Sequence, residues 1–193
     1  MMRSLRLSLL LLLSAAVISG CGSSQDENSG RHPDYSKALA GAPAPLAALY
    51  RQGNELLPGG AGAYEKRIAA LQGYPAVVNV WASWCGPCRF EFPHFQQAAA
   101  HYGKRVAFLG IDSEDSDDAA STFLAEEPVP YPSYTDPDKE LADSIGASLG
   151  LPDTAFYDRS GTLLYLKQGP YDDYAELKAD IERFAFGGSA EGG

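Results

Sequence analysis

Short apolar segments between polar ones predict the strands of this chain. Two apolar segments, 75–82 and 105–111, contain few charged residues, which is typical of strands buried on both faces of a sheet. Shorter apolar segments at 155–157 and 163–167 flank a turn-forming stretch at 158–161. This arrangement predicts an antiparallel hairpin near the end of the chain.

Helical periodicity predicts the helices. Apolar residues at helical spacing, among good helix formers, predict helices over 63–72, 87–102, 117–127, 139–145 and 171–186. Ser116 or Asp115 is expected to cap the third of these helices. Leu46, Leu49 and Tyr50 also recur at helical spacing, which indicates a further helix between residues 44 and 62.

The order of these elements predicts one α/β domain. The stretch 128–137 is rich in proline and tyrosine, so it is expected to be a loop with at most one short strand. Strands that alternate with helices and end in a hairpin and a helix predict an α/β sandwich. This domain is assigned to residues 46–187, which are enough for one substantial core. Residues 188–193, rich in glycine, are expected to form a disordered tail.

The N-terminal segment has the pattern of an export signal. Arg3 and Arg6 precede an apolar run at 7–18, which has the length of a signal-peptide core and is too short to span a membrane. The run ends in Ile18-Ser-Gly-Cys21, which resembles a bacterial lipobox. Residues 1–20 are therefore expected to be a lipoprotein signal peptide and Cys21 a lipid anchor. Ordinary cleavage near Gly20, which would leave a free Cys21, is the alternative.

The composition then changes to small and polar residues. Residues 21–45 show little apolar patterning, so they are expected to form a flexible stalk behind the anchor. The protein would then lie on the outer face of the bacterial cell membrane, in an oxidising compartment. The three cysteines of the chain divide into one anchor and one pair, with no structural disulfide left over.

Net charge restricts the partners of the protein. The chain carries a formal charge of −10, and removal of Arg3 and Arg6 with the signal leaves about −12. Such a surface disfavours nucleic acid and anionic lipid headgroups. The acidic cluster 112–118 suggests calcium, but it lacks the glycine and the distal glutamate of an EF-hand loop. A solvated turn with a favourable acidic first helical turn is the preferred interpretation.

The strongest chemical signal is Trp84-Cys85-Gly86-Pro87-Cys88, which lies between a predicted strand and a predicted helix. Gly86 and Pro87 end the strand, and proline suits the first turn of a helix. Cys85 is therefore expected at a helix N-terminus, where the positive end of the dipole lowers its pKa from about 8.5 toward about 7. Cys88 follows one turn later with its sulfur facing inward, so it is expected to resolve the mixed disulfide formed by Cys85.

A structural zinc site is the alternative for this pair. The other candidate ligands are Cys21, His32, His94 and His101. His94 and His101 are seven residues apart on one predicted helix, a spacing that suits no closed tetrahedral set with the two cysteines. A redox dithiol that needs neither metal nor cofactor is therefore preferred.

The chain resembles the thioredoxin superfamily, and within it the membrane-tethered TlpA-like thiol-disulfide oxidoreductases. The resemblance rests on four ordered blocks, 77–88, 89–93, 151–158 and Ser160-Gly161, and covers residues from about 64 to 187. It implies a thioredoxin fold, a central mixed β-sheet flanked by helices in an α/β/α sandwich. One departure is the helical pattern at 63–72, where many relatives have a strand pair.

The resemblance also implies roles for single residues. Pro152 would be a cis-proline beside the disulfide, and Leu151 would offer its backbone to a substrate chain. Asn79 stands where thioredoxin has a buried aspartate, and Glu91 would be an acidic group near the dithiol. An ordinary turn remains the alternative for Pro152.

The residues around the dithiol leave further alternatives open. Glu91 could be a solvated helix charge or a partly buried carboxylate that relays a proton to or from Cys88. Trp81 is expected to pack in the core. Trp84 is either buried or exposed as substrate surface, together with Gly86 and Pro87.

Three classes of function follow from these patterns. The preferred one is an extracytoplasmic reductase of protein disulfides, a monomer recharged by a membrane electron donor, because a Gly-Pro pair between the cysteines is typical of the reducing thioredoxin type. The second is an oxidase or isomerase that gives its disulfide to exported proteins. A peroxidase is disfavoured because no distant resolving cysteine is present. The third class is a redox-inactive binding or sensing lipoprotein.

Overall fold

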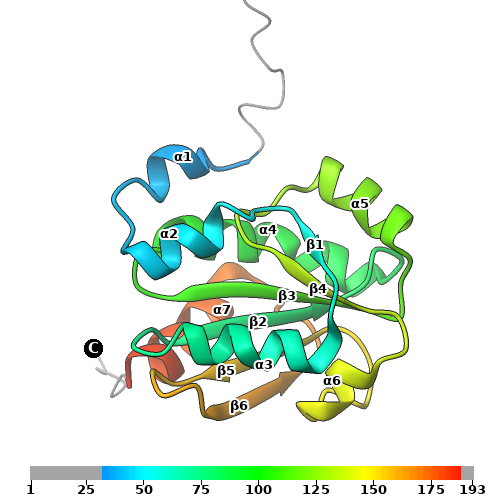
Figure 1. The fold of residues 1–193 in the computed structure, drawn as a ribbon. Helices are drawn as coiled ribbons and strands as arrows, with labels where there is room; N and C mark the ends of the chain where they lie inside the picture. The colour runs from blue at the N-terminus through cyan, green and yellow to red at the C-terminus, as the bar shows by residue number, and fades with distance from the viewer. Residues whose placement is uncertain (1–31, 188–193) are drawn as a thin grey trace, which may run out of the picture.

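A six-stranded mixed sheet forms the centre of the protein in a computed structural model that describes residues 32–187 (Figure 1). The strand order is β1-β4-β3-β2-β5-β6. The strands are β1 (Leu56–Leu57), β2 (Ala76–Trp81), β3 (Ala107–Ser113), β4 (Ser133–Asp136), β5 (Asp153–Tyr157) and β6 (Leu163–Gln168). The first four in this order run parallel, and β5 and β6 are antiparallel to their neighbours.

Helices cover both faces of this sheet. They are α1 (Tyr35–Ala38), α2 (Ala44–Tyr50), α3 (Gly60–Ala70), α4 (Gly86–Tyr102), α5 (Asp117–Glu126), α6 (Glu140–Ser144), α7 (Tyr174–Asp180) and the π-helix η1 (Ile181–Ala185). In Figure 1, α3 crosses in front of the sheet, whereas α4 and α7 lie behind it. The predicted α/β sandwich with a thioredoxin fold is therefore confirmed.

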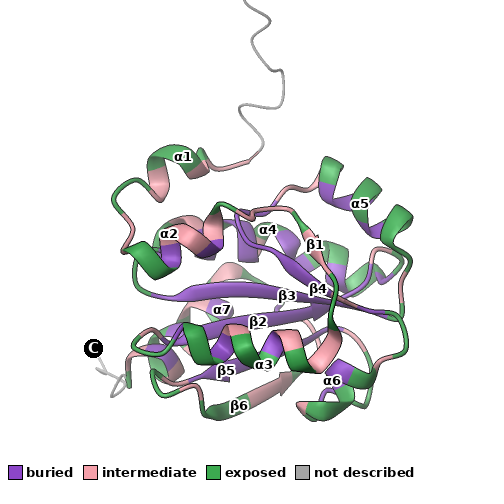
Figure 2. Cartoon of the chain, in the orientation of Figure 1, coloured by how far each residue is buried: buried purple, intermediate pink, exposed green. Residues whose placement is uncertain are grey.

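Two hydrophobic cores lie on the two faces of the sheet, and β2 contributes to both. All six residues of β2 are buried, as expected for a central strand (Figure 2). Val77 and Trp81 belong to the core under α4, α5 and α7, whereas Val78 and Val80 belong to the core under α2, α3 and α6. Because side chains alternate along a strand, one short segment joins the two cores.

The predicted strands and hairpin are present, and one further strand was missed. β1 pairs with β4 through only two residues, Leu56 and Leu57, so it is too short to show a period in the sequence. It separates α2 from α3 and divides the segment where one helix was expected. Asn54, in the left-handed region with φ of 66°, turns the chain between α2 and β1.

The last helical segment starts later than expected. The prediction began it at residue 171, but α7 begins at Tyr174 and is capped by the Asp173 side chain. The N–H of Tyr171 donates instead to Glu91 on α4, which keeps this residue outside the helix. The sequence pattern does not reveal this tertiary contact.

The expected flexible stalk is wrong for residues 32–45, which pack against the domain. Asp34 caps α1, and the Tyr35 hydroxyl donates to the carbonyl of Pro128 at 3.0 Å. His32 Nδ1 lies 3.3 Å from Gln96 Oε1 on α4. Leu39 and Ala42 also lie against the domain. These few contacts leave no apolar period in the sequence, which explains the error.

Several predictions lie outside the described residues. They are the signal peptide at 1–20, the lipid anchor at Cys21, the first part of the stalk, and the tail at 188–193. Within residues 32–187, none of the helices combines the length and the apolar character needed to cross a bilayer.

Candidate active site

Cys85 and Cys88 form a disulfide at the N-terminus of α4. Cys85 is the N-cap of the helix, its Cα lies 5.2 Å from that of Cys88, and the Cys88 N–H donates to Cys85 Sγ at 3.2 Å. Cys85 keeps 4% of its surface exposed, whereas Cys88 is fully buried. Cys85 is therefore the outer sulfur and Cys88 the inner one, as predicted.

The local sequence explains this placement. β2 ends at Trp81, and the Cys85 N–H closes a turn onto the carbonyl of Ala82. Pro87 lies in the first turn of α4, where its missing N–H leaves no helical bond unmade. After reduction, the free N–H of Cys88 and the positive end of the helix dipole both favour a thiolate at Cys85.

Glu91 is a fully buried carboxylate one helical turn beyond Cys88. Asn79 Nδ2 on β2 donates to Glu91 Oε1 at 2.8 Å, and the Tyr171 N–H donates to Oε2 at 3.0 Å. Burial raises the pKa of Glu91 to about 7, although these two donors oppose the shift. The solvated interpretation of Glu91 is therefore wrong, and the partly buried interpretation understated its burial.

Glu91 can exchange protons near neutral pH on the side of the helix that carries Cys88. Residues three apart share one face of a helix, and both of these side chains have no exposed surface. Asn79 Oδ1 has no hydrogen-bond partner among the described residues, so the amide is available to a group that gains a proton. This arrangement suits general acid-base chemistry at Cys88.

The bond between Leu151 and Pro152 is cis, as predicted. The next residue, Asp153, pairs with Val80 on β2, so Pro152 lies beside the segment that leads from β2 to Cys85. Leu151 packs against the core that contains both cysteines. The backbone that the resemblance assigns to substrate binding is therefore close to the dithiol.

Large apolar side chains are exposed near the dithiol. Trp84 is 62% exposed, and its Nε1 donates to the carbonyl of Glu114 at 2.9 Å, which fixes the ring. Trp81 is buried in the core as expected. Gly86 and Pro87 are exposed beside Cys85.

Sequence reasoning missed two further exposed apolar residues. Phe90 on α4 is 60% exposed, and Leu149, in the loop before the cis-proline, is 79% exposed. Phe90 breaks the apolar stripe formed by Phe92 and Phe95 on the same helix, and this break was a usable signal. Leu149 gives no comparable signal, because it lies in an irregular loop.

The histidines lie apart from the cysteine pair in different contacts. His94 packs edge-on against Phe90, and His101 packs against Tyr102. Across residues 32–187, no group of three or more histidine, cysteine and acidic side chains could hold a metal ion.

The acidic cluster 112–118, which begins at the end of β3, is only partly solvated. Ser116 caps α5, and Asp117 and Asp118 occupy its first turn, in agreement with the prediction. Asp112, however, is only 1% exposed, which corrects the expectation of a solvated side chain at that position. Burial, and then the carboxylate of Asp115, raise the pKa of Asp112 to about 8.

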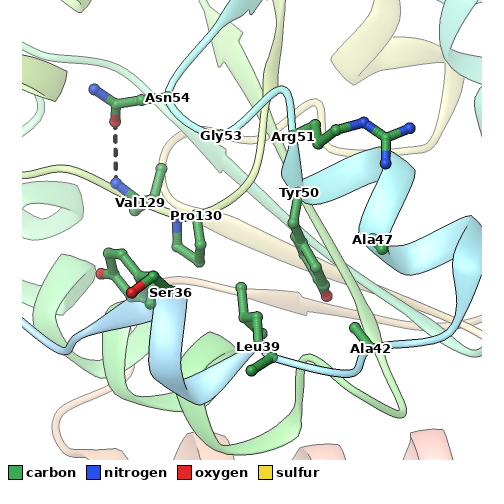
Figure 3. A pocket seen from close by; sticks show the side chains of 12 residues that line it. Ser36, Leu39, Ala42, Ala47, Tyr50, Arg51, Gly53, Asn54, Val129 and Pro130 are labelled. Carbon is green, nitrogen blue, oxygen red and sulfur yellow. Dashed lines mark hydrogen bonds between the residues drawn. The ribbon is translucent and has the colours of Figure 1, made fainter.

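A separate hollow of about 410 Å³ lies between α1, α2 and the segment around Pro130 (Figure 3). Leu39 and Tyr50 point into it, and a hydrogen bond from the Val129 N–H to Asn54 Oδ1 crosses one side at 3.0 Å. None of its lining residues belongs to the dithiol site. The hollow is therefore distinct from the redox centre.

Known proteins are similar to this chain in sequence and in fold. The Redoxin family model matches residues 40–181. The thiol:disulfide interchange protein HelX of Rhodobacter capsulatus is 31% identical over 173 residues, which are 89% of this chain and 90% of HelX. The thiol:disulfide interchange protein DsbE of Pseudomonas fluorescens biotype C is 41% identical over 96 residues, and there the chain spans only 52% of its relative.

A solved structure is also similar. A secreted Mycobacterium tuberculosis disulfide oxidoreductase homologous to E. coli DsbE superposes with a TM-score of 0.53 at 27% identity, covering 58% of this chain and 84% of that one.

A cysteine pair at a helix N-terminus, with a slightly exposed outer sulfur and a fully buried inner one beside a cis-proline, defines a thiol-disulfide oxidoreductase with a thioredoxin fold. The family model matches most of the chain and therefore shows the family. This protein belongs to the redoxin family of the thioredoxin superfamily.

Proposed function

We propose that the protein is an extracytoplasmic reductase of protein disulfides. The observation that carries this proposal is the buried Glu91, held by Asn79 and Tyr171 on the face of α4 that carries Cys88. It supplies a proton acceptor next to the inner thiol at neutral pH. The Gly86-Pro87 pair between the cysteines favours reduction over oxidation.

The reaction has two exchange steps. The Cys85 thiolate attacks one sulfur of the substrate disulfide, so that a mixed disulfide forms and the other substrate sulfur leaves as a thiolate that takes up a proton. Glu91 then accepts the proton of Cys88, and the Cys88 sulfur attacks Cys85. This step closes the Cys85–Cys88 disulfide, releases the second substrate sulfur and transfers two electrons to the substrate in total.

The surface around Cys85 supports the binding of an extended polypeptide. Trp84, Gly86 and Pro87 are exposed next to Cys85 in the chain. The cis bond between Leu151 and Pro152 precedes Asp153, which pairs with Val80 on β2. A substrate chain would pair with the backbone at Leu151 and cover the Trp84 ring. Trp84 loses little side-chain entropy on binding because its Nε1 is already fixed.

The location of the protein and its electron donor belong to the same proposal. Acylated Cys21 would anchor the chain to the outer face of the bacterial membrane, and a membrane thiol donor would reduce the Cys85–Cys88 disulfide after each turnover. The N-terminal pattern of Arg3, Arg6 and the apolar run before Cys21 supports this location.

Trapping of the mixed disulfide tests this proposal. A reduced Cys88→Ser variant, mixed with oxidised insulin, should accumulate a disulfide-linked adduct through Cys85 that dithiothreitol releases. The matched Cys85→Ser variant should form none. Adducts of equal yield with both variants, or with neither, would contradict the assignment of Cys85 as the attacking sulfur.

A further inference from the structure

The buried carboxyl of Asp112 lies at the end of β3, next to the strand that leads to the dithiol. Asp112 pairs with Trp81 on β2 and with Thr135 on β4, and only 1% of its surface is exposed. Its Oδ1 has no hydrogen-bond donor among the described residues. The dithiol chemistry proposed above does not use this group.

The turn that follows Asp112 forms hydrogen bonds with Ser83 and Trp84, the two residues before Cys85. Asp115 Oδ2 accepts the N–H of Ser83, and its Oδ1 accepts the N–H of Ser116. The carbonyl of Glu114 accepts a hydrogen bond from the Trp84 Nε1–H at 2.9 Å. Arg89 Nη1 donates to the carbonyl of Ser83 at 3.2 Å from the other side. The position of the loop 83–84 therefore depends on the position of this turn.

The charged groups that raise the pKa of Asp112 are acidic. Asp115 lies within hydrogen-bonding reach in the same turn, Asp117 lies at the start of α5, and Asp136 lies at the end of β4. Asp136 accepts hydrogen bonds from Ser113 Oγ and from two amides of α6. The cations at this turn have other partners, since Lys139 Nζ lies 3.7 Å from Glu114 Oε2 and Arg89 donates to the carbonyl of Ser83.

Asp115 also accepts two backbone N–H groups, whereas no donor reaches Asp112 Oδ1. A proton shared by Asp112 and Asp115 is therefore most stable on Asp112. Without that proton, Asp112 would be a buried carboxylate next to the carboxylate of Asp115.

We propose that Asp112 retains its proton and donates it in a hydrogen bond to Asp115, so that this carboxyl pair positions Ser83 and Trp84 beside Cys85. Asp112 is then a positioning residue for the dithiol, and this role rests on the proposed disulfide exchange at Cys85. Loss of the proton places two adjacent carboxylates in the turn. Their repulsion displaces Asp115 and releases its hold on the Ser83 N–H.

The oxidised full-length protein provides a test that does not depend on activity. Neither cysteine titrates in the disulfide form, and the chain contains two tryptophans, so 5-fluorotryptophan labelling gives two ¹⁹F resonances. A Trp84→Phe sample assigns them. The Trp84 resonance of the wild type should shift with a midpoint near pH 8, which is where Asp112 titrates.

Three variants assign the transition to Asp112. In Asp112→Asn the side-chain amide still donates to Asp115 but does not titrate, so the shift near pH 8 should disappear. Asp118→Asn removes an exposed charge from the same acidic cluster and should retain the shift. Glu91→Gln should retain it as well, because Glu91 titrates lower and on another helix. If the wild-type Trp84 resonance did not shift between pH 7 and 9, or if Asp112→Asn kept the shift, the proposal would be overturned.

Kinetics of the reduced protein supply a second test. Asp112→Ala removes the hydrogen bond that Asp112 donates to Asp115. It should slow the reaction of Cys85 with oxidised insulin at pH 7 about three- to tenfold, the effect of one lost hydrogen bond. Asp112→Asn should restore the wild-type rate at that pH. Equal rates for Asp112→Ala and wild type, or no rescue by asparagine, would contradict the positioning role. Loss of insulin reduction in the wild type itself would instead reject the proposed function, while the ¹⁹F titration stayed interpretable.

Discussion

The two faces of the sheet differ in the polar groups that they bury. The face under α2, α3 and α6 is filled mainly by aliphatic side chains and by tyrosines such as Tyr64 and Tyr134, whose rings pack edge to face. Its buried carboxyl, Asp136, accepts hydrogen bonds from Ser113 and from two amides of α6. The face under α4, α5 and α7 also buries the dithiol, Glu91 with Asn79, and Asp112. The same strands, β2 and β3, line both faces.

This difference shows how the fold divides stability from chemistry. An apolar core gains free energy from each buried group, whereas a buried carboxyl is destabilising unless it is protonated or hydrogen-bonded. The α4 face therefore holds groups that titrate near neutral pH. Substitutions on this face should change reactivity, and substitutions on the opposite face should change stability alone.

Replacement of the attacking sulfur should have the largest effect. Cys85→Ser removes the outer nucleophile, so insulin reduction should fall to the level without enzyme. The melting curve of the reduced variant should match that of the reduced wild type. A Cys85→Ser variant that kept full biological activity in the cell would support a redox-inactive binding protein instead.

Glu91→Gln should be the next most damaging change to activity. Removal of a proton acceptor of this kind typically slows a reaction about 10²-fold or more, here the release of substrate from the mixed disulfide. The wild-type rate should rise as pH passes through about 7, where Glu91 ionises, and the variant should lose that component. Single-turnover kinetics from pH 5 to 9 measure both. Identical profiles for the two proteins would remove Glu91 from the mechanism.

A cavity on the opposite face should lower stability without changing the dithiol. Leu109 on β3 is 1% exposed in the core under α3 and α6, so Leu109→Ala should lower the free energy of unfolding by about 3 kcal/mol. Leu164→Ala, at a half-exposed leucine of β6, is the matched control and should change it by less than about 0.5 kcal/mol. A change in the reactivity of Cys85 in the folded Leu109→Ala variant would weaken the division between the faces.

The pH dependence of stability should identify Glu91 on the α4 face. Its pKa is about 7 in the folded protein and 4.5 in the reference state, so the folded form binds the extra proton. This contribution is complete below pH 4.5 and is lost as pH rises through 7, a loss of about 3 kcal/mol. Urea unfolding of the oxidised protein between pH 5 and 8 measures it.

Glu91→Gln isolates the contribution of Glu91 to that titration, and Asp118→Asn is the exposed control. Asp112 contributes with the same sign, because its pKa is also raised. Glu91→Gln should therefore reduce the slope of stability against pH, and Asp118→Asn should leave it unchanged. Stability that rises with pH from 5 to 8 in the wild type would show that neither carboxyl is protonated as described.

The smallest effect is expected at the exposed tryptophan. Trp84→Ala should weaken the reduction of insulin a few-fold, because an exposed aromatic contact contributes about 1 kcal/mol or less to substrate binding. The reaction of Cys85 with a small disulfide should change less. A larger loss with the small reagent than with insulin would show that Trp84 orders the loop and does not contact substrate.

Local patterns in the sequence predicted much of the fold and the dithiol. β2, α4 and the hairpin of β5 and β6 have clear patterns of apolar residues. The Cys-x-x-Cys motif lies where strand β2 is followed by helix α4. The cis-proline came from resemblance and not from periodicity. These features depend on residues close together in the chain, which is why one sequence contains enough information to predict them.

The remaining features depend on contacts between distant residues. Tyr171 lies 80 positions from Glu91, and Ser83 lies 32 positions from Asp115. No local pattern marks such pairs, so the full burial of Glu91, the burial of Asp112 and the packing of residues 32–45 were missed or understated. The acidic cluster at 112–118 was interpreted as one solvated unit because composition cannot distinguish its buried member.

The reduction potential of the Cys85–Cys88 pair tests the proposed direction of electron flow most directly. It is measured by equilibrating the full chain with glutathione and dithiothreitol buffers at pH 7 and quantifying the two redox forms. A value near or below about −250 mV would place the pair among the reductants, as proposed. A value between about −120 and −180 mV would make the protein a disulfide donor or isomerase and contradict the proposed direction.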